Sequence, residues 1–160
     1  MSITKCKIVN KKEWRGYTSN MPKYFYGLKL QLVTTKDGIP IAFHFTPGKT
    51  ADAKALGKMI DKLPVEASIY GDSAYLDYGL EDTAFERKCI FLKIQRKSNS
   101  KRIDTLEQKM EKLKMRKRVE TTISDIKKLF PRTIHAVTLD GFLIKLTLFV
   151  FGLQLSKSIN

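Results

Sequence analysis

The sequence has few of the residues that build disulfide frameworks, zinc centres or secretory signals. Its 160 residues include only two Cys and two His, too few for a disulfide scaffold or a four-ligand zinc site, which fits a reducing cytoplasm. Residues 1–5 lack the apolar core of a secretory signal, so we expect none. A Gly-rich phosphate loop and a Gly-x-Ser-x-Gly turn are also absent from the sequence. These absences argue against secreted disulfide-rich proteins, zinc-binding modules and the common nucleotide-binding and hydrolase motifs.

A long hydrophobic run is missing as well. The longest near-continuous apolar stretch, residues 146–153, is interrupted by Thr147 and Gly152 and is well short of the ~18 to 20 apolar residues that a membrane span needs. Asp140 and Lys145 would lie inside any longer span. We therefore predict a C-terminal helix buried against the core, no membrane partner and a cytoplasmic location.

Acidic residues are scarce relative to basic ones. There are 16 Asp and Glu against 30 Lys and Arg, giving a net charge of +14, while 42% of residues are hydrophobic. That apolar fraction is sufficient for a core, so the excess charge indicates a polyanionic partner, either nucleic acid or an anionic membrane surface. Residues 93–132 carry 14 Lys and Arg against five Asp and Glu. We interpret this segment as a phosphate-binding surface, with a merely soluble helix surface as the alternative; its loop contains Arg96, Lys97, Lys101 and Arg102.

Hydrophobic periodicity and turn residues divide the chain into alternating strands and helices. Residues 1–23 are predicted to be a basic connecting segment with a short strand at 3–9. Two strands at 24–33 and 39–45 flank a type I′ turn at Asp37-Gly38. A helix capped by Thr50 or Asp52 ends before Pro64, and further elements follow: a strand at 67–72, a helix at 78–87, a strand at 89–94 and helices at 104–130 and 139–153. This order predicts an α/β fold with a mixed sheet flanked by helices.

Two acidic residues are candidates for chemistry. Asp72 follows a short apolar strand and Gly71, at the strand end where α/β sheets bind ligands; the alternative is a loop Asp that caps the next turn. Glu120 shares a broad helix face with Arg116 and Lys127, as expected of a metal-binding carboxylate flanked by phosphate-contacting cations. The alternative for Glu120 is a solvated member of a salt-bridged helix.

The remaining polar and aromatic side chains give weaker indications. His44 alternates with apolar residues and is interpreted as structural, and His135 is a candidate for phosphate contact or helix capping. Tyr24, Phe25 and Tyr26 are of a type that stacks on bases, although their place in a strand favours hairpin core and surface.

Several short motifs occur in a fixed order: YFYGLKL at 24–30, TPG at 46–48, YGDSAY at 70–75, RKSNS at 96–100 and VET at 119–121. Together they resemble the catalytic domain of bacterial insertion-sequence transposases of the Asp-Asp-Glu (DDE) class. The tail, with residues 134–138 and Gly141-Phe142, is similar to the same group. The resemblance covers nearly the whole chain, from Cys6 onward.

The resemblance implies an RNase H-like domain over residues 24–160 and DNA transposition as the activity. In the family, three acidic residues bind two divalent metals, Mg²⁺ or Mn²⁺, and cut and rejoin double-stranded DNA at the ends of the mobile element. Asp72 matches the second acid and Glu120 the third. Arg116 and Lys127 match the spacing of a Tyr-Arg-Glu-Lys signature, in which Leu113 occupies the Tyr position.

The match departs from the family at its first acid, which would fall just upstream of Met1. The family's DNA-binding helical region would lie upstream too, and no acid precedes Glu13. We therefore expect the C-terminal portion of a transposase, with its first strand missing or incomplete: a truncated element, half of a split reading frame, or a gene start placed at an internal Met. Little strand transfer by this chain alone and homo-oligomerisation through an open sheet edge are the corresponding predictions.

Two other function classes remain open from the sequence. One is a non-catalytic basic DNA-binding protein that modulates an intact transposase, for which strongly salt-dependent DNA binding is expected. The other is a basic RNA-associated protein, although no RNA-binding signature is visible.

Overall fold

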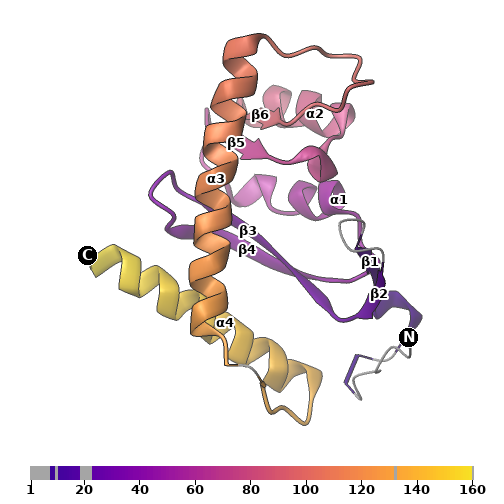
Figure 1. Ribbon diagram of the computed structural model, residues 1–160, viewed down its shortest axis with the longest axis vertical. Helices are drawn as coiled ribbons and strands as arrows, with labels where there is room; N and C mark the ends of the chain where they lie inside the picture. The colour runs from indigo at the N-terminus through magenta and orange to yellow at the C-terminus, as the bar shows by residue number, and fades with distance from the viewer. Residues whose placement is uncertain (1–7, 10, 19–22, 132, 160) are drawn as a thin grey trace.

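The strands of this protein form three separate two-stranded sheets rather than one (Figure 1). The computed structural model describes residues 8–9, 11–18, 23–131 and 133–159. Two sheets are antiparallel, β1 (Arg15–Thr18) with β2 (Lys23–Tyr26) and β3 (Leu28–Thr34) with β4 (Pro40–Pro47). The third is parallel, β5 (Ser68–Gly71) with β6 (Phe91–Ile94). The predicted α/β class is confirmed, but the described residues do not form the single mixed sheet that we predicted.

Four α-helices surround these sheets within the described residues: α1 (Asp52–Gly57), α2 (Tyr78–Lys88), α3 (Leu106–Leu129) and α4 (Leu139–Ile159). Short 3-10 turns lie at η1 (Lys12–Trp14), η2 (Ile60–Lys62) and η3 (Ser73–Tyr75). In Figure 1 α3 runs along the long axis of the molecule past β5, β6 and the β3–β4 hairpin. The helix α4 crosses α3 near the C-terminal end of α3 (Figure 1).

One hydrophobic core holds the β3–β4 and β5–β6 sheets together. Its buried members come from α1, η2, α2, β6 and the residues next to them, and include Leu56, Met59, Ile60, Leu63, Ala84, Ile90, Leu92 and Ile94. Val33 and Ala42 of the hairpin and Ile69 of β5 pack against this cluster. Side-chain packing therefore joins the two sheets where backbone pairing does not.

The N-terminal region is more ordered than we predicted. The predicted connecting segment at 1–23 contains β1, and the strand predicted at 24–33 is split at Gly27 into β2 and β3, which pair with different partners. Before the break, the Phe25 ring packs closely on Gly16 and Gly48, because a Cβ at these glycines would lie 2.4 and 3.0 Å from the ring. Most of the strand predicted at 3–9 lies outside the described residues; Ile8 and Val9 form a bend.

The hairpin turn between β3 and β4 is not of type I′. Type I′ requires positive φ at both central residues, whereas Gly38, at φ 82°, has the positive φ and Asp37 does not. The Gly38 N–H donates to the Thr35 carbonyl at 3.0 Å, and the Thr35 hydroxyl accepts from the Asp37 and Ile39 N–H groups. The Thr35 side chain thus satisfies backbone N–H groups of a longer turn, which the Asp-Gly pattern alone did not predict.

The predicted cap of α1 is wrong. Its N-cap is Ala51, and no side chain caps it. The Asp52 carboxylate instead accepts hydrogen bonds from Lys29 Nζ at 3.1 Å and Gln31 Nε2 at 2.8 Å on β3. The local sequence pattern predicted that Asp52 would cap the helix, but its carboxylate binds side chains of β3 instead.

The predicted α2 and α3 are confirmed with small shifts of their ends. Asp77 caps α2, and Cys89 ends it in the left-handed region at φ 52°, so β6 begins two residues later than predicted. Thr105 and Gln108 form a reciprocal capping box at the start of α3.

The C-terminal helix α4 is buried along one stripe only. Leu146, Val150 and Leu153 are buried, while other apolar side chains are exposed: Ile144, Leu148, Phe151, Leu155 and Ile159. The prediction of a buried helix is thus wrong for its outer face, because β4 and α3 cover one side of it. By length and composition alone α4 could cross a membrane, a criterion that core helices of soluble proteins also meet.

Candidate functional site

Asp72 lies directly after the end of β5, where we predicted it. It is exposed and is the N-cap of η3, with its Oδ1 accepting the Ala74 N–H at 2.9 Å. Gly71 permits the chain to pass close to β6, since a Cβ there would lie 2.8 Å from Ile94 Cδ1. The capping alternative is therefore realised, and the cap occupies one of the two carboxylate oxygens.

Glu120 projects from α3 with 59% of its side chain exposed. Its Oε1 accepts from Arg116 Nε at 2.9 Å, and Arg116 Nη1 donates to Gln95 Oε1 at 3.3 Å. The Gln95 N–H in turn donates to the Gly71 carbonyl at 2.9 Å. This chain of contacts brings Glu120 and Asp72 to the same end of the β5–β6 sheet, although they are far apart in sequence.

The position of Glu120 depends on how α3 is fastened to the sheet. The buried Lys112 ammonium donates to the Ile94 carbonyl at 2.9 Å and pairs with Asp104 at 2.6 Å. Lys93 donates to the Tyr70 hydroxyl at 2.9 Å, and Tyr70 donates to Glu111 of α3. The hydrogen bond from Tyr70 is the main cause that lowers the pKa of Glu111 below its ordinary value, so this carboxylate is charged and holds the helix in register.

A polar cluster adjoins Asp72 on the other side. The Tyr75 hydroxyl donates to Gln31 Oε1, and Gln31 donates onward to Asp52, which pairs with Lys29. Burial raises the pKa of Tyr75 well above its ordinary value, and the charges of Asp52 and Asp72 raise it further, so the phenol stays neutral and acts as a donor. Gln31 was not predicted as part of this site, because its burial in β3 is evident only from the structure.

The acids of this site fit a divalent metal only in part. Asp72 and Glu120 supply hard carboxylate oxygens, the donors that Mg²⁺ and Mn²⁺ prefer. Over the described ranges, however, no three His, Cys, Asp or Glu side chains form a group that could hold a metal ion. These residues therefore fit part of a metal-ligand set and not a complete one.

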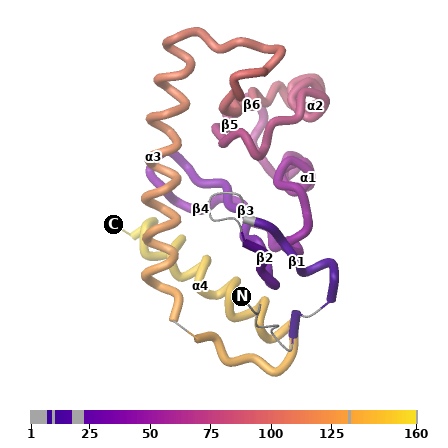
Figure 2. Tube along the Cα trace, turned by 45° about the vertical axis from the view of Figure 1, so that its right-hand side comes forward, coloured from indigo at the N-terminus to yellow at the C-terminus, as the bar shows by residue number. Residues whose placement is uncertain are grey.

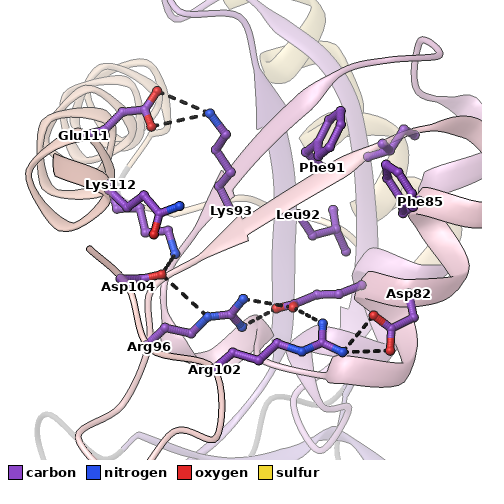
Figure 3. Close-up of a pocket in the computed structure, with 13 residues that line it drawn as sticks. Asp82, Phe85, Phe91, Leu92, Lys93, Arg96, Arg102, Asp104, Glu111 and Lys112 are labelled. Carbon is purple, nitrogen blue, oxygen red and sulfur yellow. Dashed lines mark hydrogen bonds and ion pairs between the residues drawn. The ribbon is translucent and has the colours of Figure 1, made fainter. Parts of the chain in front are cut away.

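The two arginines of the loop between β6 and α3 are neutralised by acids of α2 (Figure 3). Arg96 is 13% exposed and donates to both oxygens of Glu81, which also accepts from Arg102 at 3.0 Å. Arg102 further pairs with Asp82 at 2.8 Å. These side chains line a cavity of about 360 Å³ together with Asp104, Glu111, Lys93 and Lys112, so four cations face four acids.

Three of the other predicted DNA-contacting cations have no such partner. Lys97, Lys101 and Lys127 are exposed, and no ion pair among the described residues involves them. Lys97 and Lys101 belong to the loop and Lys127 to the last turn of α3, while Arg116 is engaged by Glu120. The predicted phosphate-binding surface is therefore divided into paired and unpaired cations.

A family model described as "Transposase DDE domain" matches residues 2–151. Comparison with curated proteins and with solved structures gives no significant match.

Proposed function

The chain belongs to the transposase DDE domain family, and on this premise we propose that it is a catalytic-domain portion with Asp72 and Glu120 as its acids for cleaving and joining DNA strands. Members of this family carry out transposition of mobile elements, act on DNA and generally use divalent metal ions. We further propose that the mixed α/β architecture is an RNase H-like domain and that the DNA is the double-stranded end of a mobile element.

The observation that carries this proposal is the convergence of the two acids at one end of the β5–β6 sheet. Asp72 follows β5 directly, and Glu120 is tied to the same end through Arg116 and Gln95. A pair of Mg²⁺ or Mn²⁺ ions held there would supply activation of the attacking oxygen and stabilisation of the leaving oxygen. Asp72 and Glu120 would each offer carboxylate oxygens to such ions, and Arg116 orients the Glu120 carboxylate.

The cations beside these acids have the complementary role. Lys97, Lys101 and Lys127 are exposed point charges that bind DNA phosphates and position the strand. Arg96 and Arg102 hold the loop against α2 through Glu81, and Arg102, 43% exposed, is the one of the two that reaches solvent for a phosphate. Because two carboxylates hold a metal pair poorly, we propose that the chain alone has little strand-transfer activity.

Metal binding by the two acids is the direct test. We expect Mn²⁺ binding, measured by paramagnetic relaxation of water, to be weak in the unaltered chain and weaker still in Asp72→Asn and Glu120→Gln. Glu86→Gln is the matched control, since Glu86 is an exposed acid of α2 away from this strand end. Equal Mn²⁺ binding by all four proteins would contradict the assignment of both acids.

Catalysis is tested on duplex DNA that carries the ends of the element, with Mg²⁺ or Mn²⁺. We expect little cleavage or strand transfer. Robust turnover that Asp72→Ala abolishes would show that a further ligand completes the site, and would contradict the proposed low activity while supporting the role of Asp72.

A second function is favoured by the incomplete ligand set among the described residues. The chain would then be a non-catalytic DNA-binding protein that modulates an intact transposase, with homo-oligomerisation as one route. Its DNA affinity would fall steeply with salt, and replacing Lys97 and Lys101 by Ala would reduce the slope of log affinity against log salt by roughly 2. Metal-independent binding with that slope, and no cleavage when Mn²⁺ is added, would select this function.

We also propose that α4 belongs to a cytoplasmic domain and does not cross a membrane. Its Phe151 ring meets Phe43 of β4 edge-on, with centroids 5.9 Å apart, and Lys157 pairs with Asp125 of α3 at 3.0 Å. These contacts attach the C-terminal half of α4 to the rest of the fold. Recovery of the chain in the membrane fraction after a carbonate wash would contradict this placement.

A further inference from the structure

The β1–β2 pair, here called the ribbon, presents an exposed aromatic and basic face. It lies at the edge of the molecule on the side away from α3 (Figures 1 and 2). Tyr17 of β1 is directly opposite Tyr24 of β2 in the antiparallel register. Arg15, two residues before Tyr17, is on the same face because side chains alternate along a strand.

The three side chains form one stacked group. The Tyr17 and Tyr24 ring centroids are 5.2 Å apart with planes inclined at 56°, and the Arg15 guanidinium lies 4.0 Å from the Tyr24 centroid. Tyr17 is 53% exposed and Tyr24 49%. The group therefore offers flat π surface and a cation to solvent instead of filling the core, as a stacking surface does.

The opposite face of the ribbon is anchored to the domain. A Cβ at Gly16 would lie 2.7 Å from the Gly48 carbonyl oxygen, so the two segments are in close contact there. The Gly27 N–H donates to the Trp14 carbonyl at 3.0 Å, and the Gly48 N–H donates to the Gly27 carbonyl at 2.9 Å. Since the backbone of the ribbon is already held in place, binding of a ligand to its outer face costs little conformational entropy of the protein.

The charge around the ribbon is available to an anion. Residues 11–26 contain four Lys and Arg but one acid, Glu13. Among the described residues, no ion pair involves Lys11, Lys12, Arg15 or Lys23. Phosphates next to the aromatic face would therefore meet cations that no internal acid neutralises.

We propose that Arg15, Tyr17 and Tyr24 form a stacking site for unpaired bases of single-stranded DNA. Every base has a π face, so such a site tolerates any sequence, and the neighbouring lysines hold the backbone. Bases inside a duplex are already stacked and do not present those faces. The inference rests on the proposed function in taking DNA as the partner, and it extends that function from duplex phosphates to unpaired nucleotides.

The test measures binding of a labelled 12-nucleotide oligo-dT and of a matched duplex by fluorescence anisotropy at fixed salt. We expect Tyr17→Ala and Tyr24→Ala each to weaken oligo-dT binding about tenfold and to leave duplex binding within twofold. Tyr17→Phe and Tyr24→Phe should restore oligo-dT binding, because they keep the ring. The single tryptophan, Trp14, is next to Arg15 and reports oligo-dT binding independently through its emission.

Phe91→Ala is the matched control. Phe85 and Phe91 have the same centroid separation, 5.2 Å, a similar inclination of 57°, and each is 49% exposed, but they lie at the neutralised cavity. Phe91→Ala should leave oligo-dT affinity unchanged. Circular dichroism of each variant verifies that it is folded.

The outcomes separate this inference from the proposed function. Tight duplex binding with oligo-dT affinity unaffected by the Tyr→Ala changes would overturn the stacking site alone. Loss of duplex binding on replacing Lys97 and Lys101, with oligo-dT affinity retained, would support two distinct sites. A chain that binds neither DNA contradicts both.

Discussion

The ribbon and the network of Arg96 and Arg102 are both basic, and each lies beside a tilted pair of exposed aromatic rings, yet their arginines are in opposite states. Around the loop, Arg96 and Arg102 donate to Glu81, and Asp82 takes up Arg102 as well. Around the ribbon, Arg15 is over the ring of Tyr24. The difference shows that the density of Lys and Arg along a chain does not give the charge available to a ligand; the acids folded against them decide it.

The largest expected effect comes from removing the acid at the centre of the loop network. Glu81 is buried, and its two oxygens receive both arginines. Glu81→Gln should cost about 3 kcal/mol of unfolding free energy, because it leaves Arg96, 13% exposed, with only the more distant Asp104 carboxylate at 3.8 Å as a counter-charge. Urea unfolding measures the change. Asp82→Asn, at the exposed end of the same network, is the control and should shift the midpoint far less; equal shifts would show that burial of Glu81 is not what matters.

The next effect tests the anchoring of the ribbon. Gly16→Ala would place a methyl group 2.7 Å from the Gly48 carbonyl oxygen, and we expect a loss of about 1 to 3 kcal/mol from overpacking. Thermal unfolding monitored by circular dichroism measures it. Gly152→Ala in α4 is the matched control, since nothing lies within 4 Å of the new Cβ, and it should be neutral or stabilising by up to ~1 kcal/mol. A Gly16→Ala protein as stable as the unaltered chain would mean that the ribbon is loosely attached.

A smaller effect distinguishes free from paired cations in DNA binding. Lys97→Ala should reduce the slope of log affinity against log salt by up to ~0.9, the value for one lost phosphate contact. Arg96→Met should leave that slope unchanged while lowering stability, because the Arg96 guanidinium already pairs with Glu81. Titrations of duplex DNA at several salt concentrations give both slopes. A reduced slope for Arg96→Met would restore Arg96 as a phosphate contact, as its place in the basic loop had predicted.

The smallest expected effect is a dependence of stability on acidic pH that arises from Asp82 and its partner Arg102. The hydrogen bond from Arg102 lowers the pKa of Asp82 below its ordinary value of 3.8. The contribution of Asp82 to stability is therefore fully present above pH 3.8 and is lost as the pH falls through the lowered pKa. Urea midpoints at pH 6 and pH 3 should differ slightly less in Asp82→Asn than in the unaltered chain. Arg15→Ala should leave the pH dependence unchanged, because its guanidinium faces a ring; a change as large as that of Asp82→Asn would put an acid beside the ribbon.

The candidate site was predictable to the extent that it rests on short-range pattern. Asp72 was placed after a strand because Gly71 follows an apolar run, and β5 ends there. Glu120 was placed on a helix by the periodicity of its neighbours, and α3 contains it. Their common location was not predictable from spacing, because it depends on the contact of Arg116 on α3 with Gln95, the residue after β6. The type I′ turn and the cap of α1 were wrong for a related reason: Thr35 and the β3 side chains Lys29 and Gln31 supplied partners that outweighed local preference.

The sequence by itself determined the order and type of most elements, the excess of positive charge and the membership of the transposase DDE family, because periodicity, turn residues and motif order are properties of neighbouring positions. Only the tertiary structure decided which cations remain free, which aromatic rings face solvent and which acids lie together. Arg96 and Glu81 are 15 positions apart, and Tyr17 and Tyr24 are on different strands. Such contacts arise when folding closes a loop and desolvates a pair, and no local pattern records which partner a charge or a ring will meet.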